Sequence, residues 1–440
     1  MFKSLLNALK VKELRNKILF TIGMLAVIRL GSAIPVPGMN VSVFRNWFNN
    51  LTSSDSFGFM DRFTGGSFEN MSILALNITP YITSSIIIQL LTIAIPKFEE
   101  WQRDGEDGRK KLTALTRYVT VALALIESIA MAVGFYRNTG VLTQQSVFLV
   151  IQIVAALTAG SAFLMWVGER ITENGVGNGI SIVLTINILS RMPSDISSLF
   201  EQFVSGKPIA RGVVSAIIIL AVIVAMVVLV VLLNGAERRI PVQYAKKIQG
   251  RKTYGGQRSE IPLKVNTAGV MPIIFAQAIM FLPIVLIGFS SAESATGIAA
   301  ALSNPTGFWY NLTVGLLIIL FTYFYTAIII NPTQMADDMK KNGGFIPGVK
   351  PGKKTVEYLD TIMSRITLPG SIFLALVAIM PAFAMMAGVQ SSFAYFYGGT
   401  SLLIMVGVVL DTLQQIESHL LMRHYDGLMK TGRIKGRYGM

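Results

Sequence analysis

Long apolar runs, each about the length of one membrane crossing, dominate the hydrophobic pattern of this chain. A helix of about 20 mostly apolar residues crosses the hydrocarbon core of a bilayer. The fifth predicted crossing is the weakest, because three glycines precede it and Pro193 is expected to end it. The pattern predicts ten crossings, over residues 18–37, 73–95, 115–136, 147–168, 178–193, 213–234, 268–289, 308–330, 367–388 and 397–421. The predicted fold class is therefore an all-α polytopic membrane protein with ten transmembrane helices.

The composition supports a membrane protein and excludes several kinds of chemistry. Hydrophobic residues make up 52% of the 440 positions and charged residues only 14%, whereas an average soluble domain has roughly 25% charged residues. The chain has no cysteine, which excludes disulfides, thiolate metal ligands and cysteine nucleophiles. The two histidines, His419 and His424, both lie near the C-terminus. We therefore expect no metal site and no cofactor.

The distribution of Lys and Arg predicts the orientation in the membrane. Of the 38 basic residues, 31 lie in the N-terminal segment, in alternate loops and in the C-terminal tail, and 6 lie in the other loops. Loops rich in Lys and Arg remain in the cytoplasm. Both termini are therefore predicted to be cytoplasmic, together with the long loops 235–266 and 331–366.

No nucleotide-hydrolysis motif is present, so we expect a protein that is not an enzyme. The nearest match to a P-loop is at Gly352 and Lys353, but Lys354 follows where Ser or Thr is needed. In addition, Pro347 occupies the position of the first glycine. Any energy for transport must therefore come from a partner or from the membrane potential.

An ion-coupled carrier is the alternative class. Carriers keep ionisable residues inside their spans as functional sites. The candidates here are scattered, and a structural role is the simpler interpretation of each: Arg29, Glu127, Asp411 and Glu417. Short and proline-interrupted spans are also typical of carriers built from inverted repeats.

Two further patterns, judged by spacing and composition alone, do not point to a functional role. Ile78 and Ile82, and likewise Ile180 and Leu184, lie four residues apart and share a helix face; such pairs are usually core or lipid-facing residues. The aromatic segment 57–66 is too short and polar to cross the membrane. It is either an interfacial loop or a short helix folded back into the protein.

Five segments closely resemble motifs of the SecY family, whose members form the channel subunit of the bacterial protein translocase. The segments are about ten residues long and occur in the family's order: 31–38, 77–91, 171–181, 263–272 and 398–404. The resemblance implies two inverted-repeat halves, helices one to five (1–193) and six to ten (194–440), around a central hourglass pore. It also implies a lateral opening towards lipid between helices two and seven, and a location in the bacterial cell membrane.

The resemblance also assigns roles to individual residues. It implies an apolar pore ring of Ile78, Ile82, Ile180, Leu184, Met271, Ile274 and Ile404. The family's plug falls at about 57–68, with Phe57, Phe59, Met60, Asp61, Phe63, Gly65 and Gly66. The lateral gate carries Thr83, Ser84, Gln89 and Gln277.

Basic clusters in the two long loops are expected to dock partners or to bind anionic lipids. Arg238, Arg239, Lys246, Lys247, Arg251, Lys252 and Arg258 lie in the first loop, and Lys340, Lys341, Lys350, Lys353 and Lys354 in the second. The resemblance implies the SecA motor ATPase and the ribosome as partners there, SecE and SecG as membrane subunits, and signal sequences and nascent polypeptides as clients. One position departs from the family: Lys350 stands where Arg is usual, and Lys lacks the bidentate fork of Arg.

Overall fold

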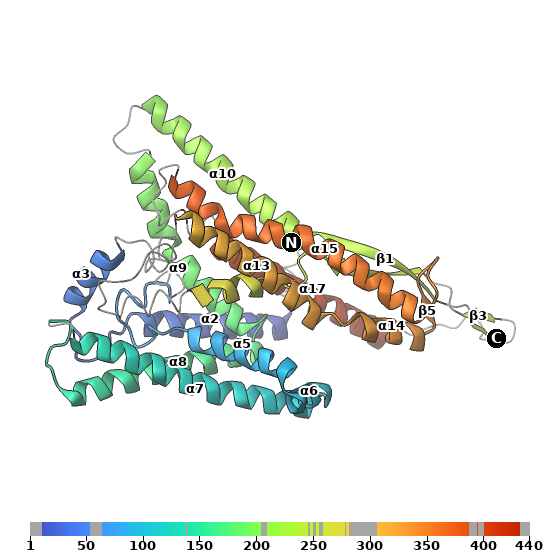
Figure 1. Ribbon diagram of the computed structural model, residues 1–440, viewed down its shortest axis with the longest axis horizontal. Helices are drawn as coiled ribbons and strands as arrows, with labels where there is room; N and C mark the ends of the chain where they lie inside the picture. Colours follow the sequence, from blue (N-terminus) through green and yellow to red (C-terminus); the bar gives the residue numbers. More distant parts are fainter. Residues whose placement is uncertain are drawn as a thin grey trace. The chain divides into compact units, whose positions relative to one another are not determined.

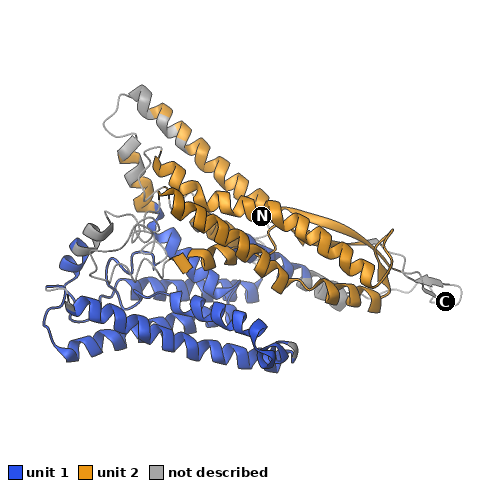
Figure 2. Cartoon of the chain, in the orientation of Figure 1, with its two compact units in different colours: residues 1–192, 408–440 blue, residues 193–407 orange. Residues whose placement is uncertain are grey.

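The computed structural model of this chain contains two compact units, each described here by itself. Unit 1 comprises residues 1–192 and 408–440, and unit 2 comprises residues 193–407 (Figures 1 and 2). They differ from the expected halves in the C-terminal segment, because residues from 408 onwards belong with unit 1. The structure describes residues 11–52, 64–137, 140–203, 209–244, 247–249, 252–254, 258–277, 279–280, 306–386, 394 and 400–431.

Unit 1 is a bundle of helices in which α5 packs on α7 and α7 packs on α8. Helix α8 begins where the sequence provides a cap, since Oγ of Ser146 accepts a hydrogen bond from the N–H of Phe148. The helices are α2 (Lys12–Ser32), α3 (Val41–Thr52), α5 (Thr79–Ala94), α6 (Pro96–Arg103), α7 (Glu106–Arg137), α8 (Val147–Asn174), most of α9 (Gly179–Phe203) and the later part of α17 (Thr400–Thr431).

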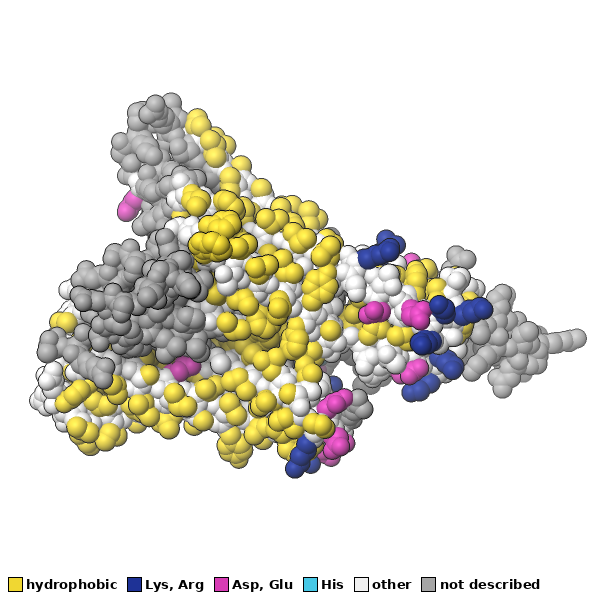
Figure 3. Space-filling model, in the orientation of Figure 1, with side chains coloured by type: hydrophobic (Ala, Val, Ile, Leu, Met, Phe, Trp, Pro, Cys, Tyr) yellow, Lys and Arg dark blue, Asp and Glu magenta, His cyan; other side chains and the backbone are white. Residues whose placement is uncertain are grey.

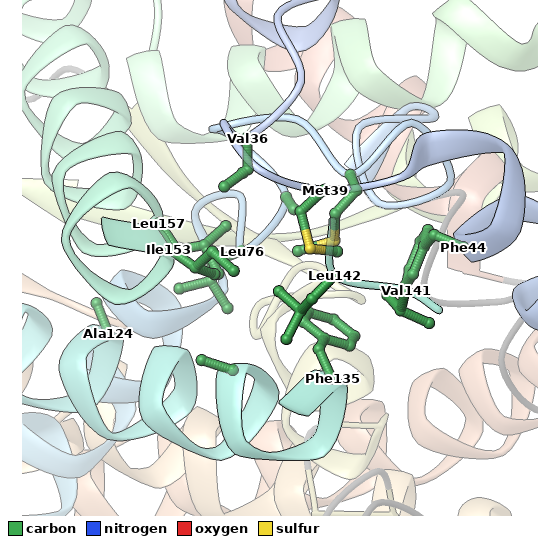
Figure 4. Close-up of a cluster of buried hydrophobic side chains, with 13 residues drawn as sticks. Val36, Met39, Phe44, Leu76, Ala124, Phe135, Val141, Leu142, Ile153 and Leu157 are labelled. Atoms are coloured by element: carbon green, nitrogen blue, oxygen red, sulfur yellow. The ribbon is translucent and has the colours of Figure 1, made fainter. Parts of the chain in front are cut away.

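An apolar core of unit 1 lies where α3, α7, α8 and the segment before α5 meet (Figure 4). Phe44 is fully buried, and its ring contacts Phe68 and Phe135 edge to face, with centroids 5.9 and 5.4 Å apart. Ile153 and Leu157 of α8 are also fully buried there. This core fixes residues 64–78 against the bundle.

Unit 2 combines membrane-length helices with a small sheet. Its helices are α10 (Ile209–Gly235), a short helix over 271–277, α13 (Phe308–Ile329), α14 (Pro332–Lys341) and α15 (Lys353–Met386). Helices α13 and α15 pack along each other. The ring of Phe275, from the short helix, contacts Tyr325 of α13 edge to face at 5.0 Å.

The two long basic loops form one folded body rather than separate loops. Strand β1 (Glu237–Tyr244) pairs antiparallel with β4 (Arg258–Lys264) and with β5 (Gly344–Phe345). A separate hairpin joins β2 (Lys247–Gln249) and β3 (Lys252–Tyr254). We call β1, β4, β5, α14, the connecting residues 342–352 and residues 353–363 of α15 the platform.

The platform has its own hydrophobic core. Ile240 and Val242 alternate with exposed residues along β1, the period-two pattern of a strand with one buried face. They pack with Leu263 of β4, Met339 of α14 and Leu359 of α15. This alternation is the sequence signal that the prediction of a plain loop missed.

Local chemistry sets the limits of α14 within the platform. Oδ1 of Asn331 accepts hydrogen bonds from the N–H groups of Thr333 and Gln334, and Pro332 takes the first helical turn. Lys340 and Lys341 lie in the last turn, where cations interact favourably with the helix dipole. The chain then turns back through Gly343, whose φ of +71° suits glycine.

The helices confirm a predominantly α-helical, multi-pass membrane protein. Within the described ranges, five helices are long and apolar enough to span a membrane, and α5 with α6, bent by 107°, forms either a broken span or a re-entrant loop. Apolar side chains cover much of the visible helical surface (Figure 3). On α7, for example, Leu125, Ile126 and Ile129 are all exposed, as expected for lipid-facing positions. The count of ten crossings stays a prediction.

Two helix boundaries differ from the prediction. Helix α9 continues through Pro193 to Phe203 instead of ending there; within membrane bundles, neighbouring groups can compensate for the N–H that proline lacks. Helix α5 begins only at Thr79, because residues 73–78 form turns. Asn77 among them has a φ of +54°, which no helix accommodates.

Candidate functional site

Ile78 and Ile82, the first residues predicted for the pore ring, lie at the start of α5. Ile78 occupies the N-cap position and is fully buried, whereas Ile82 lies one turn later and is half-buried. Pro80 lies in the first turn, where its missing N–H has no helical partner to lose. The left-handed backbone of Asn77 and this proline therefore fix the start of α5, where both isoleucines lie.

Ile180 and Leu184 lie one turn apart at the start of α9. Oδ1 of Asn178 accepts a hydrogen bond from the N–H of Ile180 at 3.1 Å and so caps the helix. A Cβ at Gly179 would lie 1.9 Å from the carbonyl oxygen of Gly168, so only glycine allows α9 to approach α8 this closely. The first turns of α9 are thereby fixed against α8, with Leu184 buried and Ile180 half-buried.

The other three residues predicted for the ring belong to unit 2. Met271 and Ile274 lie in the helix 271–277, around Pro272, and both are half-buried. Ile404 is buried on α17. Since four residues lie in unit 1 and three in unit 2, closure of all seven into one ring stays a prediction.

Only the end of the predicted plug lies within the described residues. Phe57, Phe59, Met60, Asp61 and Phe63 fall outside them. Gly65 and Gly66 have φ values of +62° and +84°. These two glycines lie directly against α9, because a Cβ on Gly65 would be 2.8 Å from the carbonyl oxygen of Asn187.

The residues predicted for the lateral gate differ in their surroundings. Ser84 is completely buried, and its hydroxyl lies 2.5 Å from the hydroxyl of Thr120 on α7, within unit 1. This contact joins α5 to α7, and the place of Ser84 in the lateral gate stays a prediction. Thr83 and Gln277 are half-buried, and Gln89 is exposed.

The platform displays most of the described basic residues predicted to dock partners. Arg238, Arg239, Lys350, Lys353 and Lys354 are all exposed, and Lys and Arg side chains gather at this end of unit 2 (Figure 3). Lys246 and Arg251 lie outside the described residues. The side chains of Lys247, Lys252 and Arg258 are likewise outside the description, although their backbones form β2, β3 and β4.

Ion pairing divides these exposed cations into two groups. Arg239 pairs with Glu237 at 2.7 Å, and its hydrogen bond to that carboxylate raises the pKa of the guanidinium. Lys354 pairs with Glu357 at 3.1 Å and Lys341 with Asp338 at 3.9 Å. Among the described side chains, none forms an ion pair with Lys350 or Lys353. These two lysines present uncompensated positive charge at the edge of the platform.

The carbonyl of Lys350 is anchored although its side chain is exposed. Oγ1 of Thr355 donates a hydrogen bond to that carbonyl at 3.0 Å, and Thr355 itself is buried. Gly348 and Gly352, on either side, have φ values of +83° and +100°. Lys350, which stands where the family usually has Arg, therefore lies on a turn of fixed backbone geometry just before α15.

Unit 1 contains a buried polar cluster that the sequence analysis missed. Nδ2 of Asn187 on α9 donates to Oδ1 of Asn77 at 3.0 Å, and both residues are almost fully buried. Arg29 of α2 donates to Oδ1 of Asn187 at 3.5 Å and to the carbonyl of Gly65 at 3.3 Å. The sequence did contain a signal for this cluster, namely the asparagine side chains within apolar spans. Burial of such an amide costs free energy unless the amide is hydrogen-bonded.

Within the described ranges, no group of three or more His, Asp or Glu side chains could hold a metal ion.

Comparison with known proteins identifies close relatives over the whole length. The family model described as SecY matches residues 72–413. The protein translocase subunit SecY of Bacillus licheniformis is 45% identical over 441 residues, covering 98% of this chain and 100% of the relative. The protein of the same description from Mycobacterium bovis is 39% identical over 450 residues, with the same coverage.

Solved structures share the fold at low sequence identity. One, described as a protein conducting channel, has a TM-score of 0.66 and 17% identity, covering 94% of each chain. Another, Sec61 from a canine ribosome-channel complex of the endoplasmic reticulum, has a TM-score of 0.62 and 16% identity, also with 94% coverage of each.

The membrane-length helices and these structural likenesses define a multi-pass membrane protein with the fold of protein-conducting channels. Within that class, the sequence matches are specific. The chain belongs to the SecY family.

Proposed function

We propose that this chain is the channel subunit of a bacterial protein translocase, which moves unfolded polypeptides across the cell membrane and releases apolar segments into it. The observation that carries the proposal is identity of 45% over essentially the full length of a SecY protein. In this proposal the chain is not an enzyme, and a partner supplies the energy.

The pore ring forms the seal in this proposal. Branched apolar side chains exclude water and ions from a narrow passage, which is gating by dewetting. They also offer no fixed hydrogen bonds, so they fit loosely around any translocating chain. The structure of unit 1 is consistent with this role for its part of the ring. Ile82 and Ile180 are half-buried, and they lie on helices whose first turns are fixed by local caps and packing.

The plug and the lateral gate complete the proposed channel. An apolar signal sequence partitions between helices two and seven, where Thr83, Gln89 and Gln277 contribute polar groups. The plug, about 57–68, fills the closed pore on the outer side. A related structure is described as showing that the plug domain of SecY stabilises the closed state and maintains a membrane seal, at a TM-score of 0.60 and 17% identity.

The charge bias of the loops supports an orientation with both termini and the platform in the cytoplasm. The platform then docks the SecA motor or the ribosome, and SecE and SecG accompany the chain in the membrane. The uncompensated charges of Lys350 and Lys353 suit ribosomal RNA phosphates, acidic side chains or anionic lipid headgroups. Labelling Lys353→Cys and Thr306→Cys from opposite sides of the membrane tests the orientation; labelling of both from one side contradicts it.

The seal is tested by replacing Ile82, Ile180 and Ile404 together by Asn. Polar side chains stabilise water in the constriction, so reconstituted complexes are expected to conduct ions at rest and to accept precursors with defective signals. The measurement is single-channel and bulk conductance in planar bilayers beside a translocation assay. Unchanged resting conductance removes these residues from the ring.

The docking function is tested by reversing single charges on the platform. Lys350→Glu is expected to weaken binding of the motor or the ribosome by at least ~10-fold, since loss of an interfacial charge contact costs about 2–5 kcal/mol. Lys341→Glu is the matched control, because Lys341 is equally exposed but is already compensated by Asp338. Lys350→Arg retains the charge and is expected to be tolerated.

Binding of purified SecA and of ribosomes to each variant distinguishes a specific contact at Lys350 from general attraction by the total charge of the loops. Equal losses for Lys350→Glu and Lys341→Glu would favour simple attraction between the basic loops and anionic lipids or phosphates.

A further inference from the structure

The buried polar cluster of unit 1 joins four segments that are distant in the sequence. Asn187 lies at its centre: its Nδ2 donates to Asn77, and its Oδ1 accepts from Arg29. Arg29 also donates to the carbonyl of Gly65, whereas the hydroxyl of Ser190 donates to the carbonyl of Asn187 at 2.7 Å. Helix α2, the Gly65 turn, the start of α5 and α9 are therefore linked through polar side chains.

Asn77 transmits this link directly to the start of α5. Its backbone is held in the left-handed region, and its carbonyl accepts a hydrogen bond from the buried hydroxyl of Ser161 on α8 at 3.2 Å. The next residue is Ile78, whose carbonyl accepts the N–H of Ile82 at 3.1 Å. Any shift of Asn77 therefore moves the first two ring residues with it.

Asn187 is connected in the same way to the other ring residues of unit 1. It lies three residues after Leu184 and seven after Ile180 on the same helix, and positions at those spacings share a helix face. The Asn77–Asn187 hydrogen bond thus joins the two helix starts that carry the apolar side chains. Its energetic weight is high, because a buried amide left without a partner is costly in a low-dielectric interior.

We propose that Asn187 is a positioning residue for the pore seal: with Arg29 it holds Asn77 and the Gly65 carbonyl, and so sets where the ring residues of α5 and α9 lie. It touches no translocating polypeptide and acts through Ile78, Ile82, Ile180 and Leu184. This inference rests on the proposed function of those residues as the seal.

The test uses the full complex purified from native membranes and three variants. Asn187→Leu keeps the branched shape and the number of side-chain heavy atoms, although leucine is larger, and it removes both hydrogen bonds. Asn77→Gly removes the partner amide while keeping a residue that accepts positive φ. Thr185→Val is the matched control, because Thr185 is also buried on α9, but among the described residues its hydroxyl bonds only to the Ser181 carbonyl of the same helix.

The readouts are resting conductance and selectivity, the latter being the translocation of a signal-deleted precursor relative to the intact one. We expect Asn77→Gly, which removes one of these hydrogen bonds, to raise both readouts about fivefold, the factor that corresponds to loss of about 1 kcal/mol for one net hydrogen bond. Asn187→Leu removes two and is expected to raise both readouts at least as much. The double variant is expected to add nothing further. Thr185→Val is expected to match the unmodified protein.

Several outcomes would overturn the inference. Normal conductance and selectivity in Asn187→Leu would do so, as would additive effects in the double variant or an equal effect of Thr185→Val. If Asn187→Leu does not accumulate in the membrane, Asn77→Gly alone decides by the same readouts.

The triple ring variant separates this inference from the proposed function. If that variant conducts at rest and Asn187→Leu does not, the positioning role is wrong and the channel stands. If the unmodified complex fails to translocate and the ring variant fails to conduct, the proposed function itself is wrong.

Discussion

Two irregular, glycine-containing segments use the same backbone geometry in opposite surroundings. In unit 1, Gly65 and Gly66 have positive φ values and lie against α9, where a Cβ on Gly65 would meet the Asn187 carbonyl oxygen at 2.8 Å. On the platform, Gly343, Gly348 and Gly352 also have positive φ values, but nothing lies within 4 Å of an added Cβ. Glycine in unit 1 is needed for both conformation and close approach, whereas on the platform it is needed for conformation alone.

The polar groups of the two segments are satisfied differently as well. The Gly65 carbonyl takes a hydrogen bond from the side chain of Arg29 on α2. On the platform, the turn around Lys350 is exposed, so water reaches it. Irregular backbone at membrane depth must find its partners within the protein, and the comparison shows where this chain provides them.

Gly65→Ala is expected to have the largest effect on stability. A left-handed alanine costs about 1–2 kcal/mol, and the clash with α9 adds about 1–3 kcal/mol as in other overpacked sites. The thermal midpoint of the purified complex, followed by circular dichroism, is expected to fall by several degrees. A thermal midpoint equal to that of the unmodified protein within experimental error would show that α9 shifts to make room for the methyl group.

Ser161→Ala is expected to come next. Its hydroxyl donates to the Asn77 carbonyl in a fully buried position, and a buried acceptor that loses its partner costs about 1–3 kcal/mol. The same thermal measurement checks it. A loss smaller than that of the platform variants below would contradict the idea that the bundle interior is the more demanding environment.

Gly348→Ala is expected to cost only the conformational part, about 1–2 kcal/mol. Gly348→Asn, which accepts positive φ more readily, is the conservative partner and is expected to cost less. Because an added Cβ meets nothing here, a loss as large as that of Gly65→Ala would mean that the turn packs against a partner.

Thr355→Val is expected to have the smallest effect, at most about 1 kcal/mol, because water can replace the lost hydrogen bond to the exposed Lys350 turn. Hydrogen exchange of the backbone amides over 348–355 is the sensitive readout. Faster exchange confined to this turn is expected, and global loss of protection would contradict it.

The sequence alone predicted the class of protein because lipid imposes a simple local rule. Runs of about 20 apolar residues predict membrane crossings, and the Lys and Arg bias predicts which loops are cytoplasmic. The five motifs then pointed to the SecY family, which the full-length matches show. The platform could also have been predicted in part from the sequence, since Ile240 and Val242 alternate with exposed residues along β1.

Only the tertiary structure decided what the polar residues inside the spans contact. Arg29 looked like an isolated charge, yet it reaches Asn187, 158 residues away, and Asn187 reaches Asn77, 110 residues away. Likewise, only the structure shows that the hydroxyl of Ser84 meets that of Thr120 on α7. Hydrophobic periodicity reports which face of a helix meets lipid, a local property. A buried hydrogen bond depends on which distant segment lies opposite, and only the packed bundle determines that.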